Sequence, residues 1–147
     1  MRTPCAVILM LAVAAAAWGR IGEGPRALEL RYGKPLRLSE AGDLATYRRG
    51  RLSVAVHFTG GLADMISFRK LPRAATPESH EPAPPLSADE VAALLQESSG
   101  AREWALASRT DRLVSWTAGD GELAAVWDLA ADSLTILSLI HISEPTR

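Results

Sequence analysis

The most constraining feature of this chain is a run of strict alternation in its first half. In segment 52–58, Leu, Val, Val and Phe occupy the even positions, and Ser, Ala and His occupy the odd ones. Side chains of a β-strand point alternately to its two faces, so this spacing predicts a strand with one apolar face. We expect that face to be shielded by a helix.

Turn and helix signals around this strand define a first unit at residues 20–72. Pro25 precedes segment 26–32 and Gly33 follows it, which is the start and stop pattern of a short helix. Turns at 48–51 and 59–61 then separate the alternating strand from expected strands at 44–47 and 62–70. The unit is therefore a helix followed by three antiparallel strands.

A second unit at residues 87–137 repeats this order. Ser87 and Glu90 have the spacing of a capping box, and the apolar stripe of a helix follows them. Further strand-like runs lie at 113–116, 122–127 and 133–136. A constant shift pairs Leu44 with Leu113, Tyr47 with Trp116, Phe58 with Trp127 and Met65 with Leu134. This correspondence suggests a degenerate duplication, although two meanders of similar turn length would share part of it.

The proline-rich segment 73–86 separates the two units. Its prolines remove backbone donors and fix φ, which predicts an exposed, extended linker. We therefore expect an α+β fold, with antiparallel meanders and helices packed on one face, in two tandem helix-plus-three-strand units.

The N-terminus has the pattern of an export signal. Arg2 precedes an apolar run at 6–17, and small residues close it, so cleavage is expected before Trp18 or before Arg20. The run is shorter than the about 20 apolar residues that span a bilayer, although a retained membrane anchor is the alternative. We take 1–19 as the signal peptide and expect no stable membrane span after its removal.

Net charge and cysteine content indicate which compartment and which partners to expect. The only cysteine, Cys5, lies in the signal, so the mature chain has no disulfide and no cysteine nucleophile. The formal net charge of -1 gives no support for nucleic-acid binding. We expect a periplasmic or secreted bacterial protein. The last residues, 138–147, resemble translated sequencing-adapter sequence, and we expect them to be an artefactual tail.

Several residues of the first unit also carry a family resemblance. The order of a helix, Tyr-Gly-Lys-Pro at 32–35, Tyr47 and the strand ending in Phe58 resembles the SmpA/OmlA (BamE-like) outer-membrane lipoproteins and uncharacterised exported bacterial proteins. The tandem order resembles the β-lactamase-inhibitor-protein-like architecture. These families bind proteins, so the resemblance implies a partner in the envelope or among secreted proteins. A lipoprotein has a Cys at its mature N-terminus, which this chain lacks.

No pattern predicts a catalytic residue, a metal site or a cofactor. His57, His80 and His141 are far apart in the sequence, and no paired carboxylates accompany them. The chain has no Gly-x-Ser-x-Gly elbow and no phosphate-binding glycine loop.

Two groups of residues are candidates for binding. Arg48, Arg49 and Arg51 cluster at an expected hairpin tip, where guanidinium groups suit an acidic partner, although a solvated turn is the alternative. The aromatic residues form either a platform for sugar or peptide or part of the core; they are Tyr47, Trp104, Trp116 and Trp127.

We expect an exported, non-catalytic binding or envelope-associated module. One alternative is a small periplasmic hydrolase, which needs His57 or His80 beside a carboxylate and a hydroxyl in a pocket. The other is a carbohydrate-binding domain, which needs coplanar exposed Trp rings.

Overall fold

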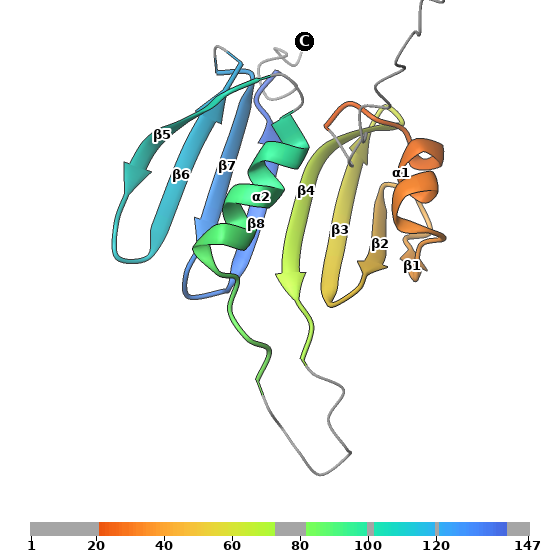
Figure 1. The fold of residues 1–147 in the computed structure, drawn as a ribbon. Coiled ribbons are helices and arrows are strands. Elements are labelled where there is room, and N and C mark those ends of the chain that lie inside the picture. The colour runs from red at the N-terminus through yellow and green to blue at the C-terminus, as the bar shows by residue number, and fades with distance from the viewer. Residues whose placement is uncertain (1–20, 73–81, 100–101, 120, 141–147) are drawn as a thin grey trace, which may run out of the picture.

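The computed structural model describes residues 21–72, 82–99, 102–119 and 121–140. These residues form one antiparallel sheet of eight strands, with two short helices lying on one of its faces (Figure 1). The strands lie side by side in the order β1-β2-β3-β4-β8-β7-β6-β5. Along the chain the elements are α1 (Pro25–Tyr32), β1 (Arg37–Leu38), β2 (Leu44–Arg49), β3 (Leu52–Thr59), β4 (Leu62–Lys70), α2 (Ala88–Ser99), β5 (Trp104–Arg109), β6 (Leu113–Ala118), β7 (Leu123–Asp128) and β8 (Ser133–Ser138).

The expected α+β class is wrong. Strands account for 45% of the described residues and helices for only 19%, so the fold is mainly β. Two strands that the sequence reading missed, β1 and β5, form the outer edges of the sheet. The helices have only 8 and 12 residues, and at about 1.5 Å per residue they are too short to form a layer over eight strands.

The two meanders also join into a single sheet. Their last strands, β4 and β8, pair antiparallel, with Ile66 opposite Ile136 and Phe68 opposite Leu134. These four side chains are buried, so the centre of the core contains residues from both halves of the chain. The helix-plus-three-strand units therefore do not form separate sheets.

The local sequence predicts the start of both helices and the end of α1. Pro25 is the first residue of α1, and Gly33 follows the helix with φ of 83°, a backbone conformation that favours glycine. The Ser87 hydroxyl accepts a hydrogen bond from the Glu90 amide at 3.2 Å. The Glu90 carboxylate accepts one from the Ser87 amide at 3.3 Å, which completes the capping box.

The sheet is buried on one face only. In β3, Val54 and Val56 are 0% exposed and Phe58 is 5% exposed, as the alternation predicts. The alternate residues of this strand, Ser53, Ala55 and His57, lie on the opposite face and are only partly buried. We call the face against α1 and α2 the helix face. Its core cluster comprises Leu28, Ala45, Tyr47, Val54, Val56, Phe58, Ala63, Ile66, Phe68, Leu86, Val91, Leu94, Leu95, Ala125, Leu134 and Ile136.

Residues that the constant shift pairs do not occupy equivalent positions in the sheet. Met65 is 40% exposed, whereas Leu134, its partner in the shift, is fully buried on the helix face. The hairpins differ too, because Tyr47 lies opposite Val54 but Trp116 lies opposite Ala125. Whether the halves arose by duplication therefore stays a prediction.

Several expected segments lie partly or wholly outside the described residues. These include the signal peptide at 1–19, positions 73–81 of the linker and positions 141–147 of the tail. Leu86, at the end of the linker, is buried in the core, and Ser138, at the start of the expected tail, is the last residue of β8. Within the part of the chain that the structure describes, no helix combines the length and apolar character needed to cross a membrane.

Candidate functional site

The candidate site is the face of the sheet opposite the two helices, which we call the open face. None of the residues that alternate onto this face from β2, β3, β4, β6, β7 or β8 is buried. One row of paired residues across this face has small side chains, so the surface is flat there. The row comprises Thr46, Ala55, Ser67, Thr135, Val126 and Ser115. A flat floor of this kind allows another protein surface to approach the backbone closely.

A second row on the open face is apolar at several positions. Leu44 lies opposite His57, His57 opposite Met65, and Met65 opposite Leu137. Leu44 is 46% exposed and Met65 is 40% exposed. Neighbouring exposed apolar side chains are a feature of interaction surfaces.

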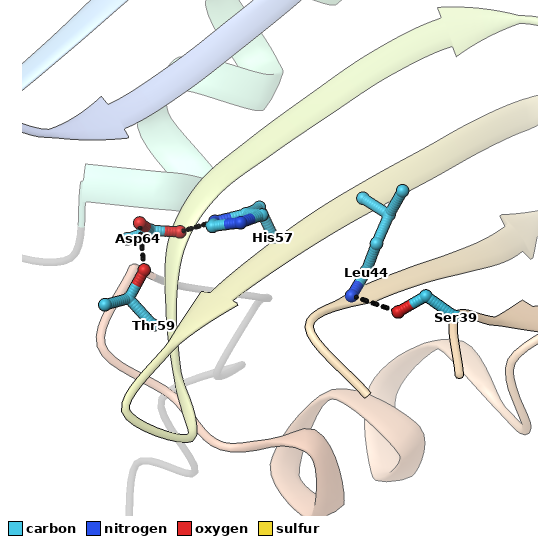
Figure 2. Close-up of polar contacts among 5 residues, drawn as sticks. All are labelled: Ser39, Leu44, His57, Thr59 and Asp64. Carbon is cyan, nitrogen blue, oxygen red and sulfur yellow. Dashed lines mark hydrogen bonds and ion pairs between the residues drawn. The ribbon is translucent and has the colours of Figure 1, made fainter. Parts of the chain in front are cut away.

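His57, which lies between Leu44 and Met65 in this row, belongs to a hydrogen-bonded group (Figure 2). Its Nδ1 lies 2.7 Å from Asp64 Oδ1, and the Thr59 hydroxyl donates to Asp64 Oδ2, also at 2.7 Å. The register of β3 and β4 shifts between His57 and Phe58, within this group. Such a bulge changes the direction of nearby side chains.

The group holds Asp64 in its ionised form. Partial burial raises the pKa of Asp64, but the hydrogen bonds from Thr59 and His57 and the charge of His57 outweigh it, so the pKa is lower than usual. Nearby, the Ser39 hydroxyl donates a hydrogen bond to Asp43 at 2.7 Å. It also accepts one from the Leu44 amide at 3.0 Å (Figure 2). This second group fixes the loop before β2.

The His57 group contains the residue types of a hydrolase but not the required order of contacts. A catalytic triad places the base between the nucleophile and the carboxylate. Here Asp64 lies in the middle, and the Thr59 hydroxyl donates to it rather than to His57. His57 is therefore not positioned to remove the proton of the Thr59 hydroxyl. His80, the other histidine considered for this role, lies outside the described residues.

The three candidate arginines do not form one cluster. Arg49 lies on the helix face, where its Nη1 is 3.7 Å from Glu97 Oε2. Arg48 lies on the open face, and its Nε donates to the Gly50 carbonyl at 3.0 Å. Arg51 is exposed in the turn between β2 and β3. Adjacent residues of a strand point to opposite faces, which separates Arg48 from Arg49.

The structure instead places Arg48 with two arginines that the sequence reading missed. Arg48 in β2 and Arg69 in β4 both pair with Ser53 in β3, the strand that lies between them. Arg37, in β1, lies opposite Thr46, two residues before Arg48 on the same face. We call Arg37, Arg48 and Arg69 the arginine patch. Alternation from Ser67 could have identified Arg69, but a two-residue strand such as β1 has no recognisable pattern.

The tryptophans do not form an exposed platform. Trp104, Trp116 and Trp127 are partly buried and packed against the core cluster. Trp104 also donates its indole N–H to the Leu95 carbonyl of α2 at 2.6 Å. These positions are those of core residues with a polar edge, which favours the packing role over sugar binding.

Among the described residues, no group of three or more His, Cys, Asp or Glu side chains could hold a metal ion. Comparison of the chain with models of protein families, with curated proteins and with solved structures finds no match. The resemblance to the SmpA/OmlA and β-lactamase-inhibitor-protein-like families therefore stays an expectation from the sequence.

Proposed function

We propose that this chain is an exported, non-catalytic protein-binding module and that the open face is its binding surface. One observation carries the proposal: one whole face of the sheet has no covering layer in the described residues, and its side chains are small or apolar as well as polar. A face that only meets water usually alternates with plainly polar residues. Here Ala55, Val126 and Leu137 occupy positions on the open face where a water-facing sheet would usually have polar residues.

The leader-like pattern at residues 1–19 supports the export part of the proposal. An exported protein would meet its partner among envelope or secreted proteins. The order of contacts at His57 supports the non-catalytic part, since the Thr59 hydroxyl is bonded to the carboxylate rather than to the imidazole.

The test places a bulky charged side chain on the floor of the open face. The A55R variant puts it in the middle of β3, whereas the control A92R puts it on the exposed side of α2. Each variant is immobilised and exposed to the envelope fraction of the source cell, after circular dichroism has confirmed that it is folded. We expect A55R to lose the proteins that the unmodified chain captures and A92R to keep them. Equal capture by both variants, or no specific capture by the unmodified chain, contradicts the proposal.

A further inference from the structure

The arginine patch brings three exposed cationic side chains from β1, β2 and β4 together on one face of the sheet. Four cationic side chains elsewhere form ion pairs with glutamates, namely Arg31 with Glu23, Arg49 with Glu97, Lys70 with Glu90 and Arg102 with Glu122. Other exposed cationic residues, such as Arg26 and Arg109, form none with a described residue, but they lie apart from one another in α1 and β5. None of the three arginines of the patch forms an ion pair with a residue that the structure describes. The arginine patch thus presents positive charge that no ion pair with a described residue neutralises.

Contacts with the backbone orient two of these arginines. The Nε of Arg48 donates to the Gly50 carbonyl at 3.0 Å, and an Nη of Arg69 donates to the Ala131 carbonyl at 3.3 Å. Each guanidinium has five N–H donors, so most of them stay available for a partner. A carboxylate in the same row, that of Asp128, accepts the amides of Ala130 and Ala131 at 3.0 and 2.9 Å.

The spacing of the patch suits a chain of carboxylates. Arg48 and Arg69 are separated by one strand, so their backbones are about 10 Å apart. Arg37 is the diagonal neighbour of Arg48, at about 7–8 Å. Alternate residues of an extended segment are about 7 Å apart, so carboxylates on one face of such a segment match the interval between Arg37 and Arg48. The interval between Arg48 and Arg69 is longer, and the length of the arginine side chains covers the difference.

We propose that the arginine patch binds an acidic segment of the protein partner, with Arg37, Arg48 and Arg69 pairing to its carboxylates while the small-residue floor accommodates its backbone. This inference rests on the proposed function. A protein segment fits better than a polyphosphate because the floor beside the patch carries Ala55 and the apolar row at Leu44 and Met65. The formal net charge of -1 likewise gives no support for a long polyanion.

The experiment measures binding of a defined probe to the protein purified after expression of the full chain. The probe is a fluorescent peptide that alternates Glu with Thr, and its reference peptide has Gln in place of every Glu. Fluorescence anisotropy compares the unmodified chain, the double variant R48Q/R69Q and the control R26Q/R109Q. The control removes two exposed arginines from α1 and from the outer strand β5, so the net charges of the two variants are equal.

We expect the unmodified chain to prefer the Glu peptide over the Gln peptide. The variant R48Q/R69Q should bind it about tenfold more weakly, since exposed ion pairs contribute modestly and two are lost. The control should bind as the unmodified chain does, and raising the salt from about 0.05 to about 0.5 M should weaken binding. Equal weakening in the two double variants, or no preference for the Glu peptide, overturns the proposal. Tighter binding of inorganic polyphosphate than of the Glu peptide also overturns it.

The capture experiment separates failure of this inference from failure of the proposed function. If A55R abolishes capture of the envelope partner but R48Q/R69Q leaves it unchanged, the open face binds a partner without the arginines, and only this inference fails. If neither variant changes capture, both proposals fail.

Discussion

The pair Ile66 and Ile136 allows a quantitative test of the single sheet. The two residues lie opposite each other in β4 and β8, where the two halves of the chain meet, and both are 0% exposed. Replacing a buried Ile by Ala removes its packing and leaves a cavity, at a cost of about 2–5 kcal/mol. We expect I66A and I136A each to lose that amount of unfolding free energy. In the double variant the losses should not be additive, because the side chains share one cavity.

The same strands supply the control. Met65 and Leu137 form the next cross-strand pair but lie on the open face, where Met65 is 40% exposed. We expect M65A and L137A to lose at most about 1 kcal/mol each, because less apolar surface returns to water. The assay is urea unfolding followed by tryptophan fluorescence and circular dichroism, which should report one coincident transition. Equal losses on the two faces, or separate transitions for the two halves, would refute the reasoning.

Three further predictions concern local features and can be measured by the same unfolding assay. G119A should lose more stability than G50A: both glycines have positive φ, but a Cβ at Gly119 would lie 2.6 Å from Arg102 Cδ, whereas a Cβ at Gly50 meets nothing. The cost of the backbone conformation alone is about 1 kcal/mol; equal losses would show that the Arg102 contact is unimportant. S87A should cost about 1 kcal/mol through loss of the helix cap, and an unchanged midpoint would contradict that role. D64N should cost about 1 kcal/mol at neutral pH. Because the folded-state pKa of Asp64 is lowered, this contribution is complete above the usual carboxyl pKa of about 4 and is lost as the pH falls through the lowered value. A stability difference between D64N and the unmodified chain that stays constant down to pH of about 2 would contradict this linkage.

Short-range patterns in the sequence predicted local structure well. The alternation in 52–58, the Pro25 and Gly33 boundaries and the Ser87 capping box all depend on residues within a few positions of one another. Interactions at that range are encoded in the spacing of side chains and in the conformational preferences of Pro and Gly.

Long-range pairing could not be predicted in the same way. Nothing in the sequence of β4 or β8 specifies that Ile66 lies opposite Ile136, because any two apolar strands could pair. The two-residue strand β1 exists only because Arg37 and Leu38 pair with β2. In β5, five of the six residues are exposed, so the amphipathic pattern of a strand is absent. Because these three features were not predicted, an α+β fold was expected where the structure is mainly β.

The candidate site was predicted least well, because its residues come together only when strands pair and when each side chain is assigned to one face of the sheet. The run from Arg48 to Arg51 looks like one cluster in the sequence, yet Arg48 and Arg49 point to opposite faces of β2. The actual neighbours of Arg48 come from β1 and β4. Asp64 likewise meets His57 only because the β3–β4 hairpin brings them together.

The most direct test of the central claim is a cysteine-accessibility measurement on the two faces of the sheet. Single cysteines replace Ser67 and Thr135 on the open face, or Val54 and Ile136 on the helix face, with Cys5 replaced by serine. The reaction rate with a thiol reagent is then measured in the folded state and in denaturant. We predict that S67C and T135C react in the folded state nearly as fast as in denaturant, and that V54C and I136C react only on unfolding. Similar protection at all four positions would show that the open face is covered, and would contradict the account.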